Sequence, residues 1–137
     1  MKDGFIKIAC ISPKLKVADC RYNSDKITEA ITNAYNSSVK ICSFPELSIT
    51  GYTCGDLFLQ SSLLNEAESS VIKIAEDTKS LDIISIVGSL VGSEMCIRDS
   101  YITVLPLFTR AIFWVLFLNL IYQITANFMK RAILHRE

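Results

Sequence analysis

Apolar and polar positions alternate in short blocks along residues 1–93, and three blocks are rich in β-branched residues. They occupy residues 5–12, 39–44 and 83–90, and proline or aspartate stands at one end of each. Runs of this length and composition predict strands. Nearly continuous apolar runs are typical of strands covered on both faces of a sheet, so we expect the first strand to be buried.

Between these blocks, apolar residues recur at helical spacing over residues 25–36 and 62–78. The pattern predicts two amphipathic helices. Residues 14–23 are expected to form a loop, with Ser24 as N-cap and Asp25 in the first helical turn. Each helical connection is long enough to join parallel strands, and the resulting order predicts an α/β fold.

The amino-acid composition of the chain changes near residue 94. From Ser100 to Arg136 there is neither an acidic residue nor a glycine, although there are seven aromatic residues. We expect residues 101–137 to form a long apolar helix. The stretch 111–129 carries no formal charge over nineteen residues, which is long enough to span a bilayer. Its Trp114 and Tyr122 do not lie at the ends, as a membrane-interface belt would require, so a membrane role is disfavoured.

The amino-acid composition limits the kinds of binding site and function that we expect. The 14 basic and 14 acidic residues give zero formal charge, which offers no general attraction for nucleic acid. One histidine and five cysteines without metal-type spacing predict no metal site. The odd cysteine count favours reduced thiols, with Cys10 and Cys42 in the core. The N-terminus lacks the long apolar segment of a signal peptide, so we expect a cytoplasmic protein.

A carboxylate stands out at Glu46, two residues beyond the second predicted strand and just before a turn at Gly51. In open α/β sheets, the ligand crevice lies beyond the carboxyl ends of the strands. Glu46 is therefore a candidate site residue. An exposed loop acid or a helix cap would occupy the same position, and the position alone does not choose between these interpretations.

Several motifs in and around the Glu46 segment resemble those of a known enzyme family. The segment FPELSITGYTCGDLF (residues 44–58) resembles the glutamate motif of the carbon–nitrogen hydrolase, or nitrilase, superfamily. GFIK at 4–7, KVADCRYN at 16–23 and DLFLQ at 56–60 are more specifically similar to the glutamine-hydrolysing domain that opens bacterial glutamine-dependent NAD(+) synthetases. The resemblance covers residues 1–92 and implies the first three strands and two helices of a nitrilase-type α-β-β-α sandwich.

The resemblance also implies a mechanism. In this family a cysteine thiolate attacks the amide of L-glutamine, a glutamate moves protons and a lysine stabilises the oxyanion. Glu46 matches the glutamate, the general base. Tyr52 matches a tyrosine that lines the pocket, although packing under the turn is an equal alternative. The ammonia would pass to a separate C-terminal synthetase domain, which uses ATP and magnesium to amidate nicotinic acid adenine dinucleotide, commonly in a homo-oligomer. No cofactor is implied for the present segment.

The nucleophilic cysteine and the lysine of the family have no match in this chain. Cys54 lies eight residues from Glu46, but no predicted neighbour activates it, so a core thiol is the better interpretation. We therefore expect the chain alone to be inactive. Another nitrilase-superfamily amidase, and a small membrane-anchored protein with an α/β head, remain alternative functions.

Residues 94–100, EMCIRDS, resemble the translation of a transposase mosaic-end adapter used in sequencing libraries. Back-translation of residues 101–137 in a shifted frame permits a string that resembles the next segment of the same synthetases. We therefore predict three parts. Residues 1–93 are the N-terminal part of the hydrolase domain, 94–100 an adapter-derived insertion, and 101–137 a frameshifted apolar tail.

Overall fold

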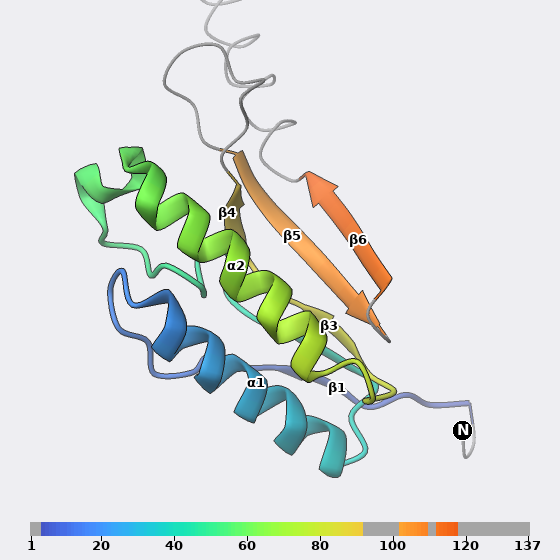
Figure 1. Ribbon diagram of the computed structural model, residues 1–137. Coiled ribbons are helices and arrows are strands. Elements are labelled where there is room, and N and C mark those ends of the chain that lie inside the picture. Colours follow the sequence, from blue (N-terminus) through green and yellow to red (C-terminus); the bar gives the residue numbers. More distant parts are fainter. Residues whose placement is uncertain (1–3, 92–101, 110–111, 118–137) are drawn as a thin grey trace, which may run out of the picture.

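A computed structural model describes residues 4–91, 102–109 and 112–117, and Figure 1 shows their arrangement. Strand β1 (Ile8–Cys10) is followed by helix α1 (Cys20–Asn36) and strand β2 (Ile41–Ser43). A short 3-10 helix, η1 (Gly55–Leu59), precedes helix α2 (Ser61–Asp77). The remaining strands are β3 (Ile84–Ile86), β4 (Ser89–Val91), β5 (Ile102–Thr109) and β6 (Ile112–Phe117). The three strands and two helices predicted for residues 1–93 are confirmed, with different ends.

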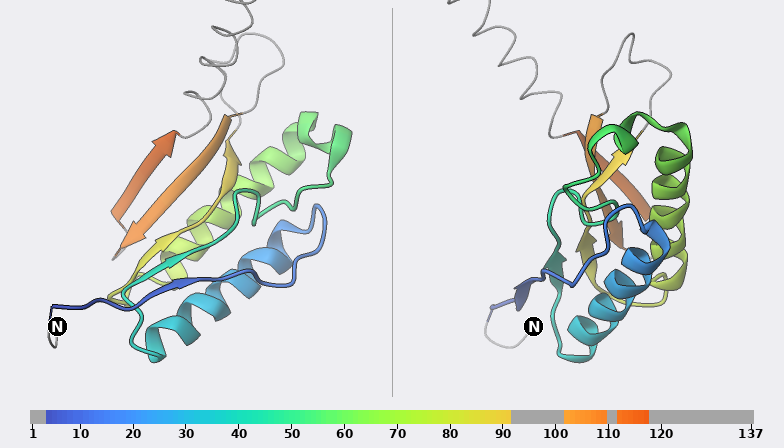
Figure 2. Two further views of the ribbon diagram at one scale, coloured as in Figure 1. Left: turned by 180° about the vertical axis from the view of Figure 1, so that it is seen from behind. Right: turned by 90° about the vertical axis from the view of Figure 1, so that its left-hand side faces the viewer.

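The first three strands form a parallel sheet in chain order. β1 pairs with β2, and β2 with β3, in a register that aligns Ile8, Ile41 and Ile84. Helix α1 connects the first pair and α2 the second. Right-handed crossovers that step in the same direction along a sheet place their helices on the same face. Both helices accordingly lie side by side on one face of the sheet (Figure 2).

The core lies between this helical layer and the sheet. Ile27 and Ile31 of α1, and Ile74 of α2, are fully buried. Cys42 at the centre of β2 and Ser85 at the centre of β3 are buried in the same row of the register. Successive residues of a strand point to opposite faces, so this central row faces the helices. The α/β packing predicted from the apolar pattern is thus confirmed for one face of the sheet.

The opposite face of the sheet is more open than the sequence predicted. Ile8 is 58% exposed, and Ile41, Ile84 and Ile86, which share its face, are only partly buried. The prediction that the first strand is buried is wrong, because β1 is an edge strand and both described helices lie on the other face. Cys10 is likewise exposed rather than a core thiol, whereas Cys42 is buried as predicted.

Helix α1 begins earlier than its apolar pattern indicated. Its N-cap is Asp19, whose carboxylate accepts a hydrogen bond from the Tyr22 amide at 3.0 Å. Ser24, predicted as the N-cap, lies inside the helix, is buried, and donates its hydroxyl to the Arg21 carbonyl at 2.8 Å. The residues buried at the start of the helix include the polar Asn23 and Ser24, whereas Arg21 is exposed. For this reason, apolar spacing alone could not locate the start of α1.

The block predicted as one strand over 83–90 is interrupted at Val87 and Gly88. β3 and β4 both pair with β5, and a single antiparallel register runs through both pairings, from Ile86 opposite Leu107 to Ser89 opposite Val104. Continued between these pairs, that register sets Val87 opposite Pro106. Proline has no amide hydrogen to donate to the ladder, which accounts for part of the interruption.

Part of the tail forms strands, so the prediction of a long helix over residues 101–137 is wrong where it can be compared. β5 pairs antiparallel with β6, from Val104 opposite Phe117 to Thr109 opposite Ile112. β-branched and aromatic residues dominate both strands, and such residues favour a sheet when a neighbouring edge is open. The rest of the tail lies outside the described residues. None of the described helices is long and apolar enough to cross a membrane.

Candidate active site

Glu46 follows the carboxyl end of β2, as the sequence predicted. The Phe44 amide donates to the Ile86 carbonyl at 2.9 Å, which extends the pairing of β2 and β3 by one residue. Pro45 then leads into a turn over residues 46–50. The Glu46 side chain is exposed and forms no ion pair with another described residue. This carboxylate thus lies beyond the carboxyl end of β2, and the described residues do not enclose it.

The backbone of this turn is held by buried residues and hydrogen bonds, although the Glu46 carboxylate forms no ion pair with the described residues. Ser48, Ile49 and Thr50 are each 0% exposed. Ser48 donates its backbone amide to the Pro45 carbonyl at 3.2 Å, and Gly51 donates to the Leu47 carbonyl at 2.7 Å. The backbone on either side of Glu46 is therefore held by buried residues and hydrogen bonds.

Asn23 joins this turn to the loop that precedes α1. Its side chain is 0% exposed and donates to the Lys16 carbonyl at 2.7 Å and to the Ile49 carbonyl at 2.8 Å. Its carbonyl oxygen accepts from the Lys16 amide at 2.8 Å. A direct backbone bond from Ala18 to the Thr50 carbonyl, at 2.8 Å, lies alongside. One buried amide thus ties together two loops that are far apart in the sequence.

Gly51 closes the turn in a conformation suited to glycine. Its φ is +81°, in the left-handed region that other residues rarely adopt. A Cβ here would lie 3.5 Å from the Val17 Cα, an ordinary van der Waals contact, so the backbone conformation alone calls for glycine. Tyr52, which follows, is 55% exposed and does not pack under the turn. Its packing alternative is therefore not supported, and a pocket-lining role stays a prediction.

Cys54 is placed as a structural thiol. It is 5% exposed, and its Sγ lies 3.1 Å from the Thr50 carbonyl oxygen, to which the thiol donates. Cys10, Cys20, Cys42 and Cys54 are all free thiols. No group of His, Cys, Asp and Glu that could hold a metal ion occurs among the described residues. Of the predicted site residues, Glu46 and Tyr52 lie in the same loop, and both are exposed.

Cys20 is the thiol whose environment is most perturbed. Burial raises its pKa from the ordinary 9.0 to about 12, and electrostatic interactions with Glu66, Cys54 and Asp19 add to this effect. The side chain is 0% exposed, at the first residue of α1. A thiol held in its protonated form at neutral pH is a poor nucleophile, so Cys20 is a core residue rather than a catalytic one.

This perturbation predicts a loss of stability at alkaline pH. In the unfolded chain the thiol ionises near pH 9, whereas in the folded chain it stays protonated to about pH 12. The unfolded state therefore binds fewer protons above pH 9, and the free energy of unfolding should fall as the pH rises from there. Urea unfolding at pH 8, 9 and 10 measures the slope.

Cys20→Ser should give a shallower decline over the same pH range, because the titrating group is gone. Cys10→Ser, which replaces an exposed thiol, should leave the decline unchanged. Equal slopes for the unmodified chain and Cys20→Ser would contradict the assignment.

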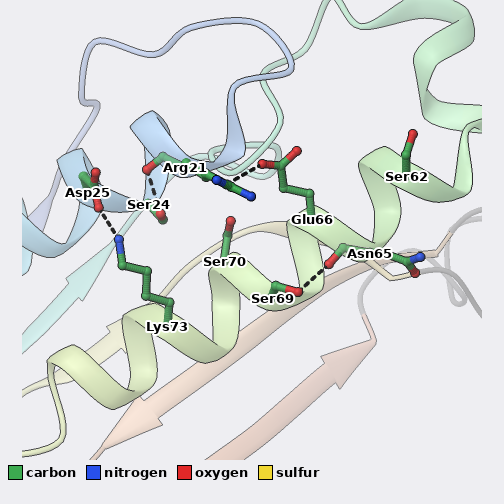
Figure 3. A pocket seen from close by; sticks show the side chains of 9 residues that line it. All are labelled: Arg21, Ser24, Asp25, Ser62, Asn65, Glu66, Ser69, Ser70 and Lys73. Carbon is green, nitrogen blue, oxygen red and sulfur yellow. Dashed lines mark hydrogen bonds and ion pairs between the residues drawn. The ribbon is translucent and has the colours of Figure 1, made fainter.

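A polar cavity of about 530 Å³ lies between the two helices (Figure 3). Its four charged side chains are paired across the helices. Arg21 contacts Glu66 at 3.0 Å, and Lys73 donates to Asp25. The other lining residues are polar and uncharged: Ser24, Ser62, Asn65, Ser69 and Ser70. Neither Glu46 nor Tyr52 lines this cavity, so it is separate from the candidate active site.

Comparison with known proteins identifies the class. The carbon-nitrogen hydrolase family matches residues 7–105, which include β1 to β4, both helices and the Glu46 turn. The chain therefore belongs to the carbon–nitrogen hydrolase family. The matched relatives include the glutamine-dependent NAD(+) synthetases of Aquifex aeolicus, 39% identical over 72 residues, and of Thermotoga maritima, 31% identical over 94 residues. The chain spans 12% of the first relative and 16% of the second.

Solved structures give the same assignment for the fold. The glutamine-dependent NAD(+) synthetase from Cytophaga hutchinsonii superposes with a TM-score of 0.69 at 30% identity, over 79% of this chain and 18% of that one. An amidase from Nesterenkonia sp. superposes with a TM-score of 0.66 at 20% identity, over 83% of this chain and 42% of that one. The nitrilase-type fold predicted from the sequence is confirmed for the part that the chain contains.

Proposed function

We propose that this chain is the N-terminal part of the glutamine-hydrolysing domain of a glutamine-dependent NAD(+) synthetase, with Glu46 as the general base. The observation that carries the proposal is the position of Glu46. It follows the carboxyl end of a parallel strand, in an anchored turn, within a chain 39% identical to such a synthetase over 72 residues. General bases of this kind must reach the proton they abstract, which a fixed turn at a sheet edge allows.

The chemistry proposed for the complete domain is hydrolysis of the side-chain amide of L-glutamine. Glu46 would take the proton from a cysteine thiol as its sulfur attacks the amide carbon, and would give that proton to the nitrogen that leaves as ammonia. A water molecule, losing its proton to Glu46, would then cleave the thioester to release glutamate, and the proton would return to the thiol. The cysteine, the oxyanion-stabilising lysine and the enclosure of Glu46 would all come from segments that this chain does not match. ATP and magnesium would act in the separate synthetase domain, and no residue of this chain is assigned to them.

The proposal predicts that the 137-residue chain does not hydrolyse glutamine. The nucleophilic cysteine of the family has no match in this sequence, so the group that would form the acyl intermediate is missing. An enzyme-coupled ammonia assay on the purified chain should give a rate no greater than that of buffer. Release of ammonia above that background, lost in Glu46→Gln, would contradict this prediction and reopen the role of Cys54.

Activity can be tested in a hybrid synthetase, in which residues 7–91 of this chain replace the corresponding segment of the Cytophaga hutchinsonii enzyme. We expect the hybrid synthetase to release ammonia from glutamine and to form NAD(+) with ATP. Activity on short aliphatic amides but not on glutamine would favour the alternative, a nitrilase-superfamily amidase.

The nucleotide sequence across residues 90–105, read without library adapters, tests the proposed origin of residues 94–137.

A further inference from the structure

The backbone of Glu46 lies directly on Gly88, in the interruption between β3 and β4. A Cβ at Gly88 would lie 1.9 Å from the Glu46 carbonyl oxygen, 2.2 Å from its carbonyl carbon and 2.5 Å from its Cα. Real Cβ atoms do not approach backbone atoms so closely, so any side chain at position 88 must displace the turn. Gly88 has no left-handed φ, so its need for glycine comes from this contact and not from its own conformation.

A buried hydroxyl fixes the same contact from the other side. Ser48, two residues after Glu46, is 0% exposed and donates its Oγ hydrogen to the Gly88 carbonyl at 3.2 Å. Before the turn, Phe44 is bonded to Ile86 through the backbone at 2.9 Å. The segment that carries Glu46 is thus attached on both sides of Glu46, by Phe44 to the end of β3 at Ile86 and by Ser48 to Gly88 in the β3–β4 connection.

We propose that Gly88 and Ser48 are positioning residues that set the location of the Glu46 carboxylate, a role that rests on the proposed function of Glu46 as general base. Neither residue needs to touch substrate. Gly88 provides the space in which the Glu46 backbone sits, and Ser48 holds that backbone against it. Placement errors of about 1 Å in a catalytic group can cost on the order of 100-fold in rate, so the catalytic effect should be large.

The first test uses the 137-residue chain itself. In Gly88→Ala, amide hydrogen exchange of Phe44, Ser48 and Gly51 should accelerate at least about tenfold, since their acceptors lie in or beside the displaced turn. Amides in the middle of α1, such as that of Ile31, should keep their rates. The control is Gly55→Ala, which strains a residue at φ +53° but has open space for a Cβ. Unchanged exchange at residues 44–51 in Gly88→Ala would overturn the proposal.

The second test is kinetic and uses the hybrid synthetase. Gly88→Ala should lower kcat for glutamine hydrolysis about 100-fold, and Ser48→Ala about threefold to tenfold, with KM for glutamine unchanged. Ser48→Ala adds no atoms, so it remains informative if Gly88→Ala does not fold. Ser85→Ala is the matched control, because Ser85 is also buried but bonds to Cys42 at 3.4 Å, away from the turn.

The outcomes separate the two claims. If Glu46→Gln abolishes hydrolysis while Ser48→Ala and a folded Gly88→Ala retain full kcat, positioning by these residues is wrong and the proposed function stands. If Glu46→Gln retains activity, the proposed function is wrong, and the positioning role falls with it. A fall in kcat that Ser85→Ala matches would assign the effect to general stability and also overturn the proposal.

Discussion

Replacing Glu46 with glutamine in the hybrid synthetase should lower kcat for glutamine hydrolysis about 10²- to 10⁴-fold, the usual contribution of a general acid–base group. Glutamine has nearly the same shape as glutamate but cannot accept the thiol proton. Because Glu46 is exposed and forms no ion pair with the described residues, its replacement should leave the fold intact. Steady-state ammonia release measures kcat, and circular dichroism checks the fold.

Two further variants test whether the effect is specific to Glu46 and to the position of its carboxylate. Glu76→Gln removes a carboxylate on α2 that is also exposed, and this variant should retain full activity. Glu46→Asp keeps the charge but withdraws it by one methylene, so kcat should still fall, because proton transfer requires hydrogen-bond reach. Full activity in Glu46→Gln would show that Glu46 is not the general base.

Replacing Asn23 with alanine should lower the free energy of unfolding of the 137-residue chain by roughly 2–4 kcal/mol. The change removes three hydrogen bonds, leaves the Lys16 amide and the Ile49 carbonyl without the Asn23 partner, and leaves the Lys16 carbonyl with only the Asp19 amide at 3.4 Å. Because the side chain is 0% exposed, water cannot readily replace it. Such a loss is a large part of the stability of a small domain. Urea unfolding followed by circular dichroism measures it.

Asn33→Ala is the matched control on the same helix. Asn33 is exposed, and the hydrogen bonds it accepts use its backbone carbonyl, which alanine retains. Its replacement should change the free energy of unfolding by no more than about 0.5 kcal/mol. Equal effects of the two substitutions would show that Asn23 contributes no more than a surface residue, and would remove its role in joining the two loops.

The helices and the parallel strands could be predicted because apolar spacing reflects burial in this part of the chain. Helix α2 begins and ends one residue before its predicted bounds. The start of α1 could not be predicted from this pattern, because the residues buried in its first turns include Asn23 and Ser24, which are polar. Their burial depends on acceptors in distant loops, which spacing within a helix does not encode.

The candidate site was predictable only in part. Glu46 could be located from the end of a strand and a motif. Gly88 and Ser48 could not, because their contact joins positions 40 residues apart and depends on how two loops cross. The strands β5 and β6 were also missed. Their apolar sequence suits either a helix or a strand, and the open edges of β3 and β4 decide the outcome.

The one-sided helical layer has a consequence for synthesis on the ribosome. Once the residues up to β3 have left the ribosome, the row containing Ile8, Ile41 and Ile84 is still partly exposed on the face opposite the helices. At roughly 5–20 residues per second, each further hundred residues of a longer chain would leave that apolar face open for about 5–20 seconds more. A nascent-chain chaperone would have time to bind there.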